Sequence, residues 1–189
     1  MRADKYSCFP QPIKHKVLDY HVSYMSKANG ECFLVKVFVV YDSKYGNTKL
    51  AAENVLKGIK DVEGIDTAIG YVNEVDVAEV ANSDLIVLGA PNHMGRPSRA
   101  MKKFVDMLAE AELKASNAAV FGTYAGRTRT VDRAVKKLEK MVEKKLPKLH
   151  LFSPSLSVKV NGVTGPIVEG ELPKCVDFGK RITGQLANQ

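Results

Sequence analysis

The sequence predicts an α/β domain built on a doubly wound, five-stranded parallel sheet in the order 2-1-3-4-5. From Leu34 onward, short β-branched or aromatic runs alternate with longer amphipathic runs, the pattern of strands joined by crossover helices. Residues 84–89 are almost continuously apolar, as expected for a strand covered on both faces. Right-handed crossovers then bring the loops that follow the strands to one edge of the sheet.

The elements are predicted in order from these runs. Residues 35–41 form the first strand, and residues 48–59 form a helix because Val55, Leu56 and Ile59 share one face. The later strands are expected at 66–72, 84–89, 117–124 and within 149–160, where Pro154 can interrupt the strand. The later helices are expected at 75–81, 98–111, 130–146 and 172–186.

The first 34 residues stand apart from this pattern. They show weak periodicity and hold three of the seven tyrosines. We therefore expect two parts, an N-terminal arm of unassigned role at 1–34 and the α/β domain at 35–189.

The charge of the chain is unevenly distributed. The net charge is +7, and residues 96–148 alone hold 14 Lys and Arg against 6 Asp and Glu. Such a field favours acidic partners, although a solvated basic helix surface explains it equally well. No nucleic-acid-binding motif accompanies the charge, so nucleic acid is not an expected partner.

The sequence indicates a cytoplasmic protein that does not span a membrane. No apolar stretch approaches the roughly 18 residues that a membrane span needs, and charged residues interrupt the first 20 positions. Cys8, Cys32 and Cys175 are too scattered for a disulfide framework or a metal motif, which favours a reducing compartment. Cys175 is predicted to be a packed core thiol.

The loop between the first strand and the first helix carries the strongest functional signal. Residues 42–48 read Asp-Ser-Lys-Tyr-Gly-Asn-Thr. The first N–H groups of a helix lack internal partners and lie at the positive end of its dipole, so they stabilise an anion. Ser43, Asn47 and Thr48 add donors, and Gly46 lets the backbone approach closely. The alternative is an ordinary turn in which Ser43 or Thr48 caps the helix.

This loop resembles the phosphate loop of flavodoxin-like proteins, which cradles the terminal phosphate of FMN. A Walker loop and a G-x-G-x-x-G fingerprint are both absent. The resemblance covers about residues 35–187 and implies the flavodoxin-like strand order and an FMN cofactor. The end of the chain is also similar to the flavodoxin module of flavo-diiron proteins, but residues 1–34 are too short for their metal domain, so no metal is expected.

Two further loops support the resemblance. Residues 90–98 are similar to the loop that covers one face or edge of the flavin ring, where a glycine peptide, here Met94-Gly95, turns its carbonyl toward the protonated flavin N5. Its alternative is a connecting loop in which Ser98 caps the next helix. Residues 121–128 resemble a third flavin loop, with Tyr124 as the stacked aromatic; alternatively, Tyr124 ends its strand half buried. Tryptophan is absent, which leaves His93 or Met94 for the other ring face.

The resemblance assigns 17 residues to the FMN site and leaves two functions open. The favoured function is an electron-transfer protein that cycles flavin redox states and docks to redox proteins, as a monomer or small homo-oligomer. The alternative is an NAD(P)H-dependent quinone or flavin reductase. No catalytic acid or base is assigned. The assigned residues are Ser43, Lys44, Tyr45, Gly46, Asn47, Thr48, Pro91, Asn92, His93, Met94, Gly95, Arg96, Thr123, Tyr124, Ala125, Gly126 and Arg127.

Overall fold

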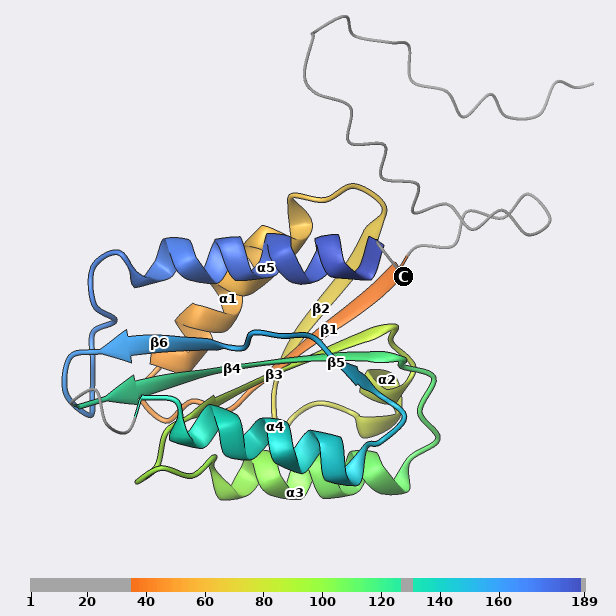
Figure 1. Ribbon diagram of the computed structural model, residues 1–189, viewed down its shortest axis with the longest axis horizontal. Helices are drawn as coiled ribbons and strands as arrows, with labels where there is room; N and C mark the ends of the chain where they lie inside the picture. The colour runs from red at the N-terminus through yellow and green to blue at the C-terminus, as the bar shows by residue number, and fades with distance from the viewer. Residues whose placement is uncertain (1–34, 127–130, 188–189) are drawn as a thin grey trace, which may run out of the picture.

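The computed structural model describes residues 35–126 and 131–187 (Figure 1). The predicted arm at 1–34 and the candidate site residue Arg127 lie outside the described residues. The strands are β1 (Val35–Tyr41), β2 (Ile65–Tyr71), β3 (Leu85–Pro91), β4 (Asn117–Ala125), β5 (His150–Leu151) and β6 (Leu156–Val160). The helices are α1 (Asn47–Lys60), α2 (Val77–Ala81), α3 (Arg99–Glu110), α4 (Arg133–Lys145) and α5 (Glu171–Ala187).

The sheet has the predicted order. Its path is β2-β1-β3-β4-β5 and all of its strand pairs are parallel. The predicted fifth strand is divided in two: β5 pairs with the start of β4, and β6 pairs with its end. Pro154 lies in the gap and cannot donate to the ladder. The two pieces together occupy the place of one edge strand, so the sequence-based order is confirmed, and the strand is interrupted around Pro154 as the sequence allowed.

Alternate residues of the central strands face two separate cores. Val37 and Val39 pack with α1 and α5 on one face, whereas Phe38 and Val40 pack with α2, α3 and α4 on the other. Figure 1 shows α1 and α5 on one side of the sheet and α3 and α4 on the opposite side. Because side chains alternate along a strand, covering both faces requires the continuous apolar runs seen in the sequence.

Helices α1 and α5 approach each other closely through two glycines. A Cβ built on Gly58 would lie 2.0 Å from the carbonyl oxygen of Val176, and one built on Gly179 would lie 2.2 Å from that of Val55. Only glycine fits such a contact between helix backbones. This packing holds the C-terminal half of α1 close against α5 on one face of the sheet.

Cys175, in α5, is completely buried in the core on that helix's side of the sheet, so the predicted core role is confirmed. Burial raises the pKa of its thiol to about 12. None of the helices in the described ranges is long and apolar enough to cross a bilayer.

Candidate functional site

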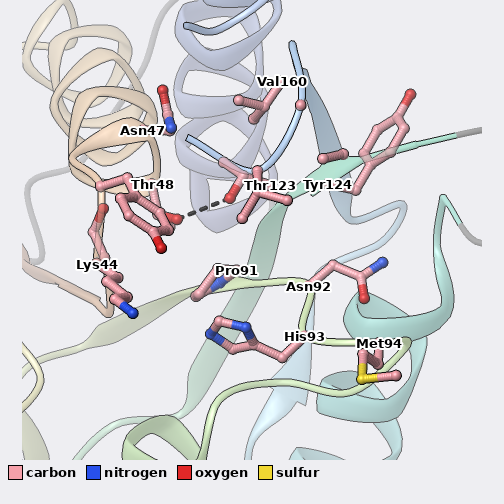
Figure 2. A pocket seen from close by; sticks show the side chains of 15 residues that line it. Lys44, Asn47, Thr48, Pro91, Asn92, His93, Met94, Thr123, Tyr124 and Val160 are labelled. Carbon is pink, nitrogen blue, oxygen red and sulfur yellow. Dashed lines mark hydrogen bonds between the residues drawn. The ribbon is translucent and has the colours of Figure 1, made fainter. Parts of the chain in front are cut away.

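A cleft opens at the edge of the sheet where the parallel strands end. Its volume is about 360 Å³, within the roughly 300–1,000 Å³ usual for small-molecule sites. Its walls come from the ends of β3, β4 and β6, from the segments that follow β1, β3 and β6, and from the start of α1 (Figure 2). This is the position beside β1 and β3 where the strand order reverses and where open α/β sheets bind their ligands.

Twelve of the 17 predicted site residues line this cleft. Gly46, Gly95, Arg96 and Gly126 do not, and Arg127 lies outside the described residues. The cleft is lined by Ser43, Lys44, Tyr45, Asn47, Thr48, Pro91, Asn92, His93, Met94, Thr123, Tyr124 and Ala125, together with three residues that the sequence analysis missed, Val160, Gly162 and Val163.

The N-terminus of α1 has no side-chain cap. Gly46 occupies the N-cap position with a φ of 82°, and the helical ladder starts with the N–H of Leu50 donating to its carbonyl at 2.9 Å. The alternative that Ser43 or Thr48 caps this helix is therefore wrong. Helix α3 differs, because Ser98 accepts from the Met101 N–H at 3.1 Å. The first N–H groups of α1 thus remain available to an anion beside the cleft.

A buried hydroxyl pair joins the start of α1 to the end of β4. The Oγ1 atoms of Thr48 and Thr123 lie 2.8 Å apart, and Figure 2 shows this bond across the cleft wall. The two residues are only 2% and 5% exposed. Since one hydroxyl belongs to α1 and the other to β4, the bond sets the position of the phosphate loop relative to the sheet.

Asn47 connects the phosphate loop to the segment after β6. Its side-chain amide donates to the carbonyl oxygen of Thr164 at 2.9 Å. Gly165 has a φ of 100°, and a Cβ there would lie 2.3 Å from Asn47 Oδ1. The missed residues Val160, Gly162 and Val163 belong to the same segment. Placing the fifth strand next to β4 already implied that the loop after it reaches this edge of the sheet.

The loop after β3 closes in a tight turn at residues 93–96. His93 and Arg96 exchange backbone hydrogen bonds of 2.9 and 3.0 Å, and Met94 and Gly95 have φ values of 52° and 77°. Positive φ at both central positions is the type I′ turn. Asn92 Oδ1 accepts from the Gly95 N–H at 2.6 Å. The Met94-Gly95 peptide therefore sits at the tip of the turn, and the Met94 side chain is fully exposed.

The two tyrosines that line the cleft, Tyr124 and Tyr45, differ in where their rings lie. Tyr124 lines the cleft, but Figure 2 shows its ring extending away from Thr48 and Lys44. Alternation along β4 explains this, because Thr123 takes the position facing Thr48. Tyr45 is 47% exposed, and the Lys44 ammonium lies 5.2 Å from its ring centroid, within cation–π range.

This geometry defines a class of protein: a doubly wound α/β fold whose cleft offers an uncapped helix N-terminus to a nucleotide phosphate. The family model described as a flavodoxin domain matches residues 38–163, and the chain belongs to the flavodoxin family. Flavodoxins are FMN-binding electron-transfer proteins, which confirms the cofactor predicted from the phosphate loop. The donors at the start of α1 fit the phosphate of that cofactor.

Characterised relatives and solved structures are similar to this chain. The flavodoxin of Aquifex aeolicus is 39% identical over 71 residues, which are 38% of this chain and 38% of that protein, so this match spans well under two thirds of that relative. The flavodoxin of Maridesulfovibrio salexigens is 33% identical over 114 residues, 56% of this chain and 77% of that protein. The structure of an archaeal flavodoxin superposes with a TM-score of 0.67 at 22% identity, covering 82% of this chain and 99% of the other. A flavodiiron core from Synechocystis superposes with a TM-score of 0.65 at 18% identity, covering 82% of this chain and 37% of the other.

A buried carboxylate secures the segment that the sequence analysis missed. Glu171, at the start of α5, accepts from the Lys159 backbone N–H at 2.9 Å and from the Lys174 ammonium. Burial by itself would raise the pKa of this carboxyl, but the hydrogen bonds from Lys174 and Lys159 outweigh it and lower the pKa. Glu171 thereby connects the end of the sheet to α5.

We expect Glu171→Gln to lower the free energy of unfolding by about 1 kcal/mol at pH 7. Because the folded pKa is depressed, the stabilisation by the carboxylate is present above the unfolded pKa and is lost as the pH falls through the folded pKa. Urea unfolding of both proteins at pH 7 and at pH 3 measures this. An equal difference at the two pH values would show that the charge of Glu171 does not contribute.

Proposed function

We propose that this chain is an electron carrier that cycles the redox states of bound FMN and docks to redox proteins. The observation that carries the proposal is the uncapped N-terminus of α1, opening beside Lys44 and Thr48 into a cleft at the switch point of the sheet. When bound, FMN supplies one- and two-electron transfer chemistry.

In this proposal, each loop has a separate task. The first N–H groups of α1, with Ser43 and Thr48, hold the phosphate, and Lys44 adds a positive charge. The turn at 93–96 borders the cleft through His93 and Met94, and its Met94-Gly95 peptide is the part expected to face the flavin ring. Because Met94 is fully exposed, the turn and the flavin beside it would lie at the protein surface, where a redox partner can approach them.

Residues 35–189 form the FMN-binding domain, and residues 1–34 are an additional arm. Arg96, Gly126 and Arg127 complete the set of predicted FMN contacts. We place the protein in the cytoplasm, as a monomer or small homo-oligomer.

Stepwise anaerobic reduction of the FMN-loaded full-length chain tests the proposed function. We expect visible spectra that pass through a stable one-electron-reduced form, since a carrier must hold single electrons, together with slow oxidation of added NADPH and NADH. Fast oxidation of either nucleotide with direct two-electron bleaching would instead assign the chain to the reductases. Absence of FMN binding would contradict both functions.

A further inference from the structure

A second cleft adjoins the first one, and its lining is strongly basic. It has a volume of about 600 Å³ and shares Lys44 and His93 with the FMN cleft. Figure 2 shows the His93 ring directed toward the side on which Lys44 lies. Arg96, Arg99 and Lys102 supply the remaining cationic lining, from the turn after β3 and the first residues of α3. We call it the basic cleft.

The cations of the basic cleft have no acidic partner among the described residues. No carboxylate of residues 35–126 and 131–187 lies within 4.0 Å of the charged groups of Lys44, Arg96, Arg99 or Lys102, whereas six lysines elsewhere form ion pairs. The positive end of the α3 dipole adds to the same field. Lys44 and Arg96 are assigned to FMN in the proposed function, so Arg99 and Lys102 are the two cations of this cleft that place unneutralised positive charge beside the FMN cleft in the described part of the chain.

The carboxylate that lines the basic cleft does not neutralise this charge at the surface. Asp42 is 9% exposed and follows β1 at the base of the cleft. It lies near Tyr71. Desolvation raises the pKa of the Tyr71 phenol, and the negative charge of Asp42 raises it further. Arg96 and Arg99, in contrast, are exposed.

We propose that the basic cleft is the docking site for the carboxylates of an acidic redox partner. The inference rests on the proposed function, and it adds the sign of the partner's charge and the place where it binds. Carboxylates in this cleft would neutralise Arg99 and Lys102 and bring the partner's surface against the turn at 93–96. Charges so placed speed diffusional encounter and orient the partner. A protein surface suits the site better than one small anion, because the cleft of about 600 Å³ has room for more than one carboxylate side chain.

The test compares two double variants of the FMN-loaded full-length chain. Arg99→Gln/Lys102→Gln removes two charges from the basic cleft. Lys144→Gln/Lys148→Gln removes two charges from exposed positions, one at the C-terminal end of α4 and one three residues after that helix ends. None of these four residues lines the FMN cleft. Both variants therefore have the same net charge and differ in its position.

Electron transfer to a small anionic acceptor gives the first readout. Two ferricyanide ions each take one electron from fully reduced FMN and become ferrocyanide, while protons pass to solvent. At low ionic strength we expect Arg99→Gln/Lys102→Gln to slow this reaction roughly tenfold and the control pair to change it less than about twofold. With hexaammineruthenium(III), a cationic acceptor, the first variant should not be slower. Equal slowing of ferricyanide by both pairs would overturn a localised site.

Equilibrium binding of a hexaglutamate peptide gives a second readout that does not depend on electron transfer. We expect saturable binding that weakens with salt, shifts backbone NMR signals around Arg99, and is lost in the cleft variant but kept in the control. Binding of inorganic phosphate with no peptide binding would overturn docking in favour of a small-anion site. Either negative result with FMN still bound contradicts only this inference, whereas absence of FMN binding contradicts the proposed function.

Discussion

Ser43→Asp is expected to weaken FMN binding at least about 100-fold. Ser43 lines the cleft next to the uncapped start of α1, so an aspartate there adds a negative charge where the FMN phosphate is expected. Two unit charges about 5 Å apart at an effective dielectric constant near 20 repel by about 3 kcal/mol, and each 1.4 kcal/mol corresponds to a factor of ten in affinity. Quenching of flavin fluorescence during titration measures the dissociation constant.

Riboflavin, which lacks the phosphate, is the matched control ligand. We expect its affinity for Ser43→Asp to stay within about threefold of that for the unmodified chain, because no phosphate meets the new charge. Ser157→Asp, on β6 and outside both clefts, should leave FMN affinity nearly unchanged. If FMN and riboflavin lost affinity equally, the phosphate would not lie at the start of α1, and the assignment of that loop would be wrong.

Gly58→Ala is expected to lower the free energy of unfolding by about 2 kcal/mol or more. In an exposed helix the same change stabilises by up to about 1 kcal/mol, because alanine is the better helix former. Here the added methyl group would lie 2.0 Å from the carbonyl oxygen of Val176, and α1 and α5 must separate to admit it. Chemical unfolding followed by circular dichroism gives the difference.

Gly184→Ala in α5 tests the sign of this effect. A Cβ at Gly184 meets no atom within 4 Å, so we expect this variant to be stabilised by about 0.5–1 kcal/mol. Opposite signs for the two substitutions would identify the close contact of α1 with α5 as the cause. A stabilised Gly58→Ala protein would show that the two helices can separate at little cost.

Periodicity in the sequence predicted the elements with small errors at their ends. The first strand is observed where it was predicted, at Val35–Tyr41, and the second begins one residue earlier than predicted, at Ile65. Helix α2 begins at Val77 because Asp76 caps it, its side chain accepting from the Ala78 N–H at 3.0 Å, whereas the prediction began it at residue 75. The last strand is interrupted around Pro154 as the sequence allowed, but the sequence did not show which residues on either side of the proline still pair with β4.

The candidate site was predicted as a set of loops more accurately than as a set of side chains. Twelve of its residues line one cleft because loops after parallel strands share an edge. The orientation of Tyr124, the displacement of Arg96 into the basic cleft and the lining contributed by Val163 were not predicted. Each depends on which way a particular residue points or on which loop reaches furthest.

Local sequence was sufficient for the features that depend on near neighbours. The alternation of strands and helices follows from the hydrophobic period, and the FMN cofactor was implied by the resemblance of the short motif at residues 42–48 to the phosphate loop of flavodoxin-like proteins. Contacts between distant segments were decided by the fold, among them the Thr48–Thr123 bond, the bond from Asn47 to Thr164 and the approach of Gly58 to Val176. They join residues 75, 117 and 118 positions apart, and such pairs meet only when the packing of whole helices against the sheet brings their backbones together.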